Sequence, residues 1–410
     1  MPSMPGPIAQ PSAPASLASD SSKKTIGAVV IGGDYQGLGI VRSLGRRKVP
    51  VCVIDDEHSI ARFSKYTSCF VPVRSLRGEE QTVQHVLDAG HRLGLEGWVL
   101  YPTREETVAA FARYRSSLAG FFRVPTPNWD TTQWFWDKRN TYRRASELGI
   151  PIPSTWYVTH ASDLEKIEAD PPFVIKPAIK EHFIYSTKVK AWRANSRPEL
   201  CELFQRAAKL VGPGEVMVQS LIPGGGSQQF GYGAFFKEGK ALGSMVVRRA
   251  RQHPPEFGRS STYVETVELP LLEDLSERFL RAINYYGLVE LEYKLDPRDQ
   301  QYKLLDVNGR TWGYHTLGFG AGVDFPLMLY ADQVGELVEY RRGRTGVKWI
   351  RLITDVPTGI SEIFGGRQNW RSYFRSLLGV DVESVFSWED PIPGLVEVAL
   401  LPYLAWKRGF

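Results

Sequence analysis

Apolar and polar residues alternate over residues 288–295, LVELEYKL, with a period of two. This period predicts a β-strand with one buried face. The turn-forming sequence DPRD follows, and residues 302–307, YKLLDV, predict a return strand. Pairing of the two strands would bring Glu292 close to Asp306, with Asn308 just past the strand end. Two carboxylates and a carboxamide are oxygen ligands that suit Mg²⁺, although the same acids would also fit a solvated surface hairpin.

Short apolar strands alternate with helical segments between residues 23 and 124. TIGAVVIGG, VPVCVIDDE, CFVPV and WVLY predict strands, and residues 77–94 and 105–116 predict helices. A helix joins the first two strands, so we expect a βαβ unit and a Rossmann-like domain over residues 23–124. Residues 103–106 lie where a strand ends and a helix begins, which is where open α/β sheets bind ligands.

The glycines between residues 32 and 39 raise the question of dinucleotide binding. Their spacing is not G-x-G-x-x-G, because Asp34 and Tyr35 interrupt it. We therefore expect a Rossmann-like domain without a dinucleotide, and an NAD-dependent enzyme is the less favoured interpretation.

Two lysines, Lys138 and Lys176, lie on predicted elements where they are candidates to bind an anion. Residues 131–148 predict a helix that carries Lys138, with Asp130 as its N-cap. Residues 173–176, FVIK, predict a buried strand that ends in Lys176. A lysine at the end of a buried strand is costly unless an anion meets it, so Lys176 indicates an anionic ligand. Lys138 alone would fit a solvated helix face equally well.

The segment 178–187 contains no glycine and is predicted to be a loop that carries Lys180 and His182. A lone histidine in a loop is more often an ordinary surface residue than a functional one. Lys188 and Lys190 are placed on the next predicted strand, and the sequence assigns them no role.

Residues 230–236 and 241–248 predict a hairpin, and arginines follow it directly. Alternation puts Arg249 and Arg251 on one face. Guanidinium groups suit planar, bidentate binding of phosphate or carboxylate, while a solvated sheet edge is the plainer interpretation. Further along, Tyr314 and His315 are assigned to an acceptor pocket or to core packing.

Composition excludes several classes of protein. The chain has 410 residues with 43% hydrophobic and 23% charged residues, which is ordinary for a soluble globular protein. The net charge of +5 fits anionic small molecules and is too small to indicate nucleic acid. The three cysteines match no zinc or redox spacing and favour a reduced, cytoplasmic compartment. No apolar run is long enough for a transmembrane segment.

The two ends of the chain differ in character from the middle. Residues 1–22 are rich in Pro, Ala and Ser and predict a disordered tail rather than a signal peptide. The chain ends in PGLVEVALLPYLAWKRGF, which is apolar and then basic. We expect this stretch to pack on the protein, with contact to a membrane surface as the alternative.

The ordered set of polar residues over 125–335 resembles the ATP-grasp superfamily. That family has an acid on one strand and acid–x–Asn on the next, and Glu292, Asp306 and Asn308 match this pattern. The resemblance implies that the three residues hold Mg²⁺ or Mn²⁺ against the phosphates of ATP. It also implies that Arg310 binds the acceptor or the transferred phosphate. A glycine replaces the proline that the family commonly has before this arginine.

The same resemblance implies roles for three basic side chains. It implies that Lys138 and Lys176 contact the phosphates of ATP, and that Arg249 contacts phosphate or the acceptor carboxylate. Segment 178–187 takes the place of a loop that covers the phosphates and is often rich in glycine in the family. Since glycine is missing here, side chains are expected to do part of that work.

The adenine contacts are likewise implied by the resemblance. Residues 219–222 match the hinge between two subdomains, where backbone groups of Ser220 and Ile222 would bind the adenine edge. Gln219 stands where many members have Glu, and its amide can both donate and accept. Gln228 lies near the position of a ribose-binding acid in some members.

The resemblance implies a fold class of α/β and α+β. A Rossmann-like N-terminal domain would be followed by an ATP-grasp module of two α+β subdomains. The expected boundaries are 1–22 for the tail, 23–124 for the first domain, 125–335 for the module and 336–410 for an extension of unknown role.

The implied activity is that of a carboxylate–amine ligase. ATP would phosphorylate a small-molecule carboxylate, and an amine would displace phosphate to give an amide. The branches of D-aspartate ligase and carbamoyl-phosphate synthase look nearest, and a homodimer is compatible with the pattern. Two alternatives stay open, namely a nucleotide-binding regulatory protein without ligation and a phosphotransferase on the same fold.

Overall fold

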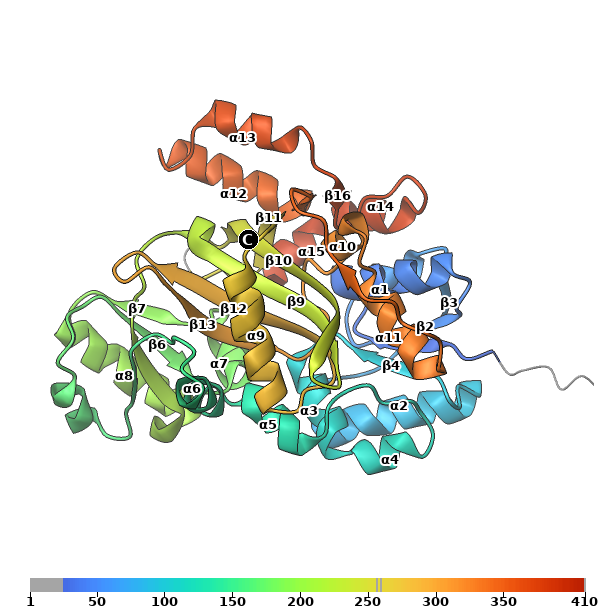
Figure 1. Ribbon diagram of the computed structural model, residues 1–410, viewed down its shortest axis with the longest axis horizontal. Coiled ribbons are helices and arrows are strands. Elements are labelled where there is room, and N and C mark those ends of the chain that lie inside the picture. Colours follow the sequence, from blue (N-terminus) through green and yellow to red (C-terminus); the bar gives the residue numbers. More distant parts are fainter. Residues whose placement is uncertain (1–24, 256, 259, 409–410) are drawn as a thin grey trace, which may run out of the picture.

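In a computed structural model, the described residues form three β-sheets that lie side by side (Figure 1). The structure describes residues 25–408 except 256 and 259. The predicted tail, residues 1–22, lies outside the described residues. Both α/β and α+β parts are present, and the predicted fold class is confirmed.

The N-terminal sheet is parallel and has the order β3-β2-β1-β4. Its strands are β1 (Ala28–Ile31), β2 (Val51–Asp55), β3 (Thr67–Pro72) and β4 (Val99–Pro102). Its helices are α1 (Tyr35–Arg46), α2 (Glu79–Leu93), α3 (Glu105–Arg113) and α4 (Arg115–Ala119). The βαβ order read from the sequence is confirmed, and α3 begins directly after the end of β4.

A small antiparallel sheet with the order β5-β8-β6-β7 forms the second layer of the molecule. Its strands are β5 (Thr155–Tyr157), β6 (Phe173–Pro177), β7 (Trp192–Ala194) and β8 (Val216–Ser220). The helices before and around it are α5 (Trp129–Trp136), α6 (Lys138–Glu147), α7 (Lys180–Thr187) and α8 (Arg197–Val211). Short 3₁₀ turns are η1 (Ala61–Phe63), η2 (Ala161–Lys166), η3 (Pro213–Glu215) and η4 (Gly226–Gln228).

The large central sheet has the order β13-β12-β9-β10-β11-β15-β16, with β14 beside β10. Its strands are β9 (Gln229–Lys237), β10 (Lys240–His253), β11 (Ser260–Val267), β12 (Gly287–Asp296), β13 (Gln301–Asn308), β14 (Arg341–Arg342), β15 (Lys348–Ile350) and β16 (Val382–Glu383). Its helices are α9 (Pro270–Ala282), α10 (Thr316–Ala321), α11 (Phe325–Val334), α12 (Leu352–Phe364), α13 (Trp370–Leu377), α14 (Ile392–Ala399) and α15 (Leu401–Arg408).

The hairpin of β12 and β13 is confirmed in type, position and register. Glu292 lies directly opposite Asp306 across the pair, as the alternation predicted. Asn308 is the last residue of β13 rather than the first residue after it, and it lies opposite Glu290. The strand ends therefore gather three acids and one amide within a few residues of each other.

Two local predictions were wrong. The helix predicted over 131–148 is divided at Asp137, which ends α5 and caps α6 by accepting from the Arg139 amide; Asn128, not Asp130, caps α5. The segment predicted as a loop over 178–187 is mostly the helix α7. Capping by the Asp137 side chain accounts for the first outcome. The second is accompanied by packing of Phe183 from α7 into the core of the small sheet.

The N-terminal sheet and the central sheet share one hydrophobic core. That core contains Val30 and Tyr101 from the first sheet together with Trp312 and Trp349 from the later part of the chain. The Tyr101 hydroxyl also donates to the Pro326 carbonyl at 2.9 Å. The first domain is therefore held against the central sheet, and its strand ends are fixed relative to the β12–β13 hairpin.

The C-terminal segment continues the central sheet and is tied down by buried ion pairs. Strand β15 pairs with β11, and β16 pairs with β15. The ion pairs are Arg42–Asp390 (2.9 Å), Arg251–Asp355 (2.8 Å) and Arg351–Glu397 (2.7 Å). Within the terminal stretch that begins at residue 393, Glu397 is the buried partner of Arg351, whereas Leu395 and Val398 are exposed, so α14 packs on the protein through one face. Among the described residues no helix has the length and apolarity to cross a bilayer.

Candidate active site

A cavity of about 560 Å³ lies between the small sheet and the central sheet. This is the size range of sites that enclose a small-molecule ligand. It brings together seven residues that the sequence analysis singled out: Lys138, Lys176, Gln219, Ser220, Ile222, Glu292 and Asp306. Residues almost 170 positions apart in the chain thus face one space.

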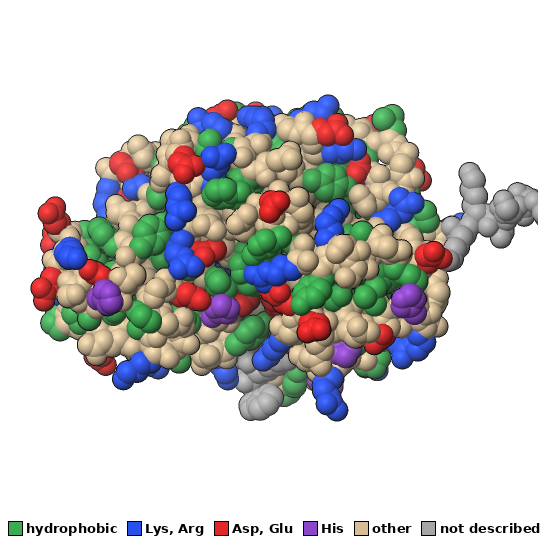
Figure 2. Space-filling view, turned by 90° about the horizontal axis from the view of Figure 1, so that it is seen from below, with side chains coloured by type: hydrophobic (Ala, Val, Ile, Leu, Met, Phe, Trp, Pro, Cys, Tyr) green, Lys and Arg blue, Asp and Glu red, His purple; other side chains and the backbone are tan. Residues whose placement is uncertain are grey.

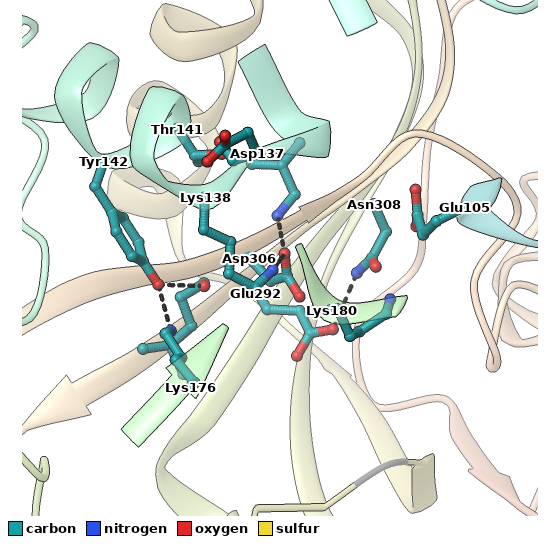
Figure 3. A network of polar contacts seen from close by, with 12 residues as sticks. Glu105, Asp137, Lys138, Thr141, Tyr142, Lys176, Lys180, Glu292, Asp306 and Asn308 are labelled. Carbon is teal, nitrogen blue, oxygen red and sulfur yellow. Dashed lines mark hydrogen bonds and ion pairs between the residues drawn. The ribbon is translucent and has the colours of Figure 1, made fainter. Parts of the chain in front are cut away.

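The two predicted lysines enter the cavity from different elements (Figure 3). Lys138 is the first residue of α6 and forms an ion pair with Asp306. Lys176 lies near the end of β6 and donates to the Tyr142 hydroxyl at 2.5 Å. Tyr142 in turn donates to the carbonyl of Leu305, the residue before Asp306. Lys138 is therefore held by the β13 acid itself, and Lys176 is held through Tyr142 by the preceding residue of the same strand.

The acids opposite them remain charged in spite of burial. Burial acts to raise the pKa of Asp306, but the charges of Lys138 and Lys180 hold it below its ordinary value. Burial acts in the same direction on Glu292, and the neighbouring Arg249 and Lys190 hold its pKa well below the usual range. Ionised carboxylates at both positions are what a divalent cation requires.

Asn308 is oriented by two glutamates. Its Nδ2 donates to Glu290 Oε2 at 3.1 Å and to Glu292 Oε1 at 2.9 Å. Glu290 also accepts from the Tyr314 hydroxyl. Burial and the charge of Glu292 raise the pKa of Glu290 to about 7. Because both donors of the amide face carboxylates, the Asn308 carbonyl oxygen is left on the other side, where Arg310 lies 3.4 Å away.

The two predicted arginines lie behind the acids rather than on the wall of the main cavity. Arg249 on β10 contacts Glu292 and is 3% exposed, so it acts within the network. Arg310 forms an ion pair of 3.0 Å with Glu105, the first residue of α3. This contact places the strand end of the first domain at the site, as expected for residues 103–106. A bulge separates Arg249 from Arg251, which instead pairs with Asp355, so the two arginines do not share one role.

The donor set suits a hard divalent cation whose coordination is completed by substrate oxygens. Glu292 and Asp306 face each other across the strand pair, and the Asn308 oxygen is turned away from the glutamates. The described residues contain no group of three His, Cys, Asp or Glu side chains that could hold a metal by themselves. The set of two carboxylates and one amide thus fits Mg²⁺ bound together with phosphate oxygens.

The hinge residues lie on the cavity wall, but several of their polar groups are already engaged. The Ser220 amide donates to the Ser154 carbonyl at 3.0 Å, and the Gln219 side chain donates to Thr155 Oγ1 at 2.7 Å. The Ile222 carbonyl accepts from Lys294 at 2.9 Å. A carbonyl oxygen has two lone pairs, so the Ile222 oxygen keeps one for a ligand. The single backbone N–H of Ser220 is already used by Ser154.

Gln228 is not on the wall of the cavity, where its neighbour Gln229 lies instead. Strand β9 begins at Gln229, and successive side chains of a strand point to opposite faces. A shift of one position at the start of a strand therefore turns the neighbouring residue, here Gln229, toward the cavity.

Two further lysines line the cavity. Lys180 belongs to the segment whose side chains were expected to help cover the phosphates, and Lys190 received no role from the sequence. Lys180 opens α7 and lies 3.5 Å from Glu181. Lys190 lies in the connection between α7 and β7, not on a strand, and no ion pair within 4 Å joins it to a described residue. Burial lowers the pKa of Lys190 to about 8, against the attraction of Glu292. A half-buried cation beside the acids is a candidate contact for an anionic ligand.

Other sequence candidates have structural roles. His182 is half exposed and pairs with Glu215 at 2.8 Å, which agrees with an ordinary surface histidine. In the first domain the Gly33 amide donates to Asp55 at 2.7 Å, and Arg104 pairs with the same carboxylate. The acid at the end of β2 is thus used within the protein. His315 lines a separate cavity of about 220 Å³ beside α1.

Lys176 gives a prediction about pH. Burial lowers its pKa to about 8, with Asp306 opposing the shift. Its ammonium is charged below that pH and neutral above it, so we expect affinity for ATP to fall as the pH rises through about 8. Calorimetry near pH 8.5, in two buffers of different ionisation enthalpy, should show proton uptake on ATP binding.

The variant Lys176→Ala should weaken ATP binding by about 10–100-fold and lose part of that proton uptake, because one charge-assisted contact is worth about 1.5–3 kcal/mol. Lys209→Ala, on the exposed side of α8, is the matched control. Unchanged ATP affinity in Lys176→Ala would remove this lysine from the site.

Known proteins that resemble this chain include two ligases. No family model matches the chain. The chain is 22% identical over 360 residues to D-aspartate ligase of Enterococcus faecium, covering 81% of this chain and 83% of the relative.

Two solved structures share the fold. An L-amino acid ligase from Bacillus licheniformis superposes with a TM-score of 0.60 and 16% identity, over 77% of this chain and 76% of the other. The biotin carboxylase domain of a 2-oxoglutarate carboxylase from Hydrogenobacter thermophilus, solved with MgADP and bicarbonate, gives 0.62 and 14%, over 79% and 74%.

Proposed function

We propose that this chain, which has the ATP-grasp fold, is an ATP- and Mg²⁺-dependent ligase that joins a small-molecule carboxylate to an amine. The observation that carries the proposal is the meeting of Lys138 and Lys176 with Glu292 and Asp306 in one cavity. Cations for phosphate and carboxylates for a metal are both needed to bind a nucleotide triphosphate for phosphoryl transfer.

The proposed position of ATP follows from the distribution of charge in the cavity. The hinge end offers the Gln219 amide and the Ile222 carbonyl, whose oxygen is bound by Lys294 and keeps one lone pair, so it suits the polar edge of a base. The other end holds Lys138 and Lys176 and suits the phosphates. Glu292 and Asp306, with Asn308, would hold Mg²⁺ there, where the ion neutralises charge on the β- and γ-phosphate oxygens.

The acceptor carboxylate is proposed to bind on the far side of the acids. Arg310 reaches this region from the end of β13, and Glu105 fixes it from the first domain. A guanidinium held in this way can orient a carboxylate against the γ-phosphate. A carboxylate oxygen would then attack the γ-phosphorus with loss of ADP. The amine nitrogen would next attack the acyl carbon, forming the amide, releasing phosphate and losing one proton.

Amino acids are the proposed first substrates to test. The names of two similar proteins, D-aspartate ligase and L-amino acid ligase, support this choice. Both names describe ligases that act on amino acids.

The test is Mg²⁺-dependent release of ADP from the full chain, with amino acids and small carboxylates supplied singly and in pairs. We expect ADP only when a particular carboxylate and amine are present together, with an amide of the matching mass. ADP with one compound and a stable phosphorylated product would indicate a phosphotransferase instead. ATP that binds and stays intact with every pair would contradict the proposal.

A further inference from the structure

The C-terminal helices expose large apolar side chains that the proposed reaction does not use. On α13 and at its end, Trp370, Phe374 and Leu378 form a stripe four residues apart and are 54%, 56% and 76% exposed. Tyr373, on the next stripe, is buried and anchors the helix. An amphipathic helix in a globular protein buries its apolar stripe, so this stripe lacks its partner.

The neighbouring helices continue the pattern. On α12, Phe364 is 88% exposed and follows the exposed Ile360 by one turn. On α14, Ile392, Leu395 and Val398 are exposed while Glu397 faces inward to Arg351. We call the exposed apolar side chains of α12, α13 and α14 the C-terminal apolar surface. The three helices lie along one edge of the molecule, at the top of Figure 1.

Arginines accompany this surface, and Arg367 has one acid near it, Glu362 of α12, on whose pKa its charge acts. Arg367, Arg371 and Arg375 are exposed, and none of them has an ion pair within 4 Å among the described residues. The sequence of α13, WRSYFRSL, contains no acid. Arg371 and Arg375 lie one turn apart beside the apolar stripe. By contrast, Figure 2 shows the face opposite these helices, where acidic, basic and apolar side chains are interspersed.

We propose that the C-terminal apolar surface binds the surface of a bilayer that contains anionic lipids. Apolar side chains flanked by unpaired arginines complement an acyl layer below negatively charged headgroups. The helices are too short to span, because the eight residues of α13 extend about 12 Å and a hydrocarbon core is about 30 Å thick. The protein would therefore lie on the membrane, with the cavity between the sheets left accessible.

Charge favours a bilayer over a second copy of the chain. A two-fold interface uses the same patch on both subunits, so docking of α13 on α13 would gather four arginines, Arg371 and Arg375 from each copy, and α13 itself contains no acid to offset them. An anionic lipid surface supplies the missing negative charge. The inference rests on exposed groups that do not line the cavity, and it stands independently of the proposed ligase activity.

The test is co-sedimentation of the full chain with phosphatidylcholine vesicles that contain or lack phosphatidylglycerol. We expect binding only to the anionic vesicles, and less of it at high salt. Arg371→Glu with Arg375→Glu should weaken binding by on the order of thirtyfold or more, since each basic residue near the surface contributes about 1 kcal/mol. Trp370→Ser with Phe374→Ser should weaken it by at least about tenfold, because less apolar area enters the bilayer.

The matched control is Lys209→Glu with Leu210→Ser on α8, which changes one exposed charge and one exposed apolar side chain elsewhere. This variant should bind like the wild type, and circular dichroism should show that all variants are folded. Equal binding to both vesicle types, or equal losses in control and test variants, would overturn the proposal. A dimer without lipid that Phe374→Ser dissociates would assign the surface to a second copy and would overturn it as well.

Discussion

Replacing Asp306 with Asn, or Glu292 with Gln, is expected to lower ATP turnover by on the order of 10³-fold while the fold persists. A metal ion that neutralises the transferring phosphoryl group contributes several kcal/mol, and each 1.36 kcal/mol is a factor of ten in rate. Both substitutions keep the shape of the side chain and remove only its charge. The measurement is Mg²⁺-dependent ADP release at saturating ATP.

The same variants separate a metal ligand from a residue that only supports the fold. Asp306 is paired with Lys138, so its neutralisation frees that ammonium for phosphate. ATP binding without Mg²⁺ should therefore be retained or become tighter, while the gain on adding Mg²⁺ is lost. Asp299→Asn, in the exposed turn of the same hairpin, should behave like the wild type. Full activity in Glu292→Gln or Asp306→Asn would show that the metal assignment is wrong.

The second large effect is expected at Lys190. This lysine lines the cavity, is half-buried, and has no ion-pair partner within 4 Å among the described residues. Segment 180–187 forms the helix α7, so in the proposed complex side chains rather than glycine amides would contact the phosphates. We predict that Lys190→Met weakens ATP binding by about 10–100-fold, the value of one charge-assisted contact.

Lys188→Met is the matched control for Lys190→Met, since Lys188 is exposed, lies two residues away and does not line the cavity. Titration calorimetry with ATP and with adenosine tests the reason for the effect. Loss of affinity for ATP alone supports a phosphate contact. Equal loss for both ligands would mean that the substitution disturbs the cavity itself, and no loss would exclude Lys190 from binding.

The acids at the centre of the site were predictable because their positions depend on local sequence. Alternation over 288–295 fixed which side chains share a face, and a short turn fixed the pairing of Glu292 with Asp306. Lys176 could be predicted for a similar reason, because it stands near the end of a short apolar strand. Register and burial of adjacent strands can be inferred from a period of two.

Other features depend on contacts between distant segments and left no local signal. Lys190 lies in an irregular connection, so no periodicity indicates its direction. Glu290 was placed beside Glu292 by alternation, but its contacts with Asn308 and Tyr314 arise from a different strand and the following loop. The helix in place of the loop at 180–187 also escaped prediction, since its residues favour no single structure and its hydrophobic face is weak.

The most direct test of the proposed ligation uses a substrate pair found in the ADP assay, with ¹⁸O in the carboxylate. If the carboxylate attacks the γ-phosphorus and the amine then displaces phosphate, one ¹⁸O must appear in the released phosphate for every ADP formed. That is the result we predict from mass spectrometry of the phosphate. Phosphate without ¹⁸O, formed together with the amide, would contradict an acylphosphate and the account of this site.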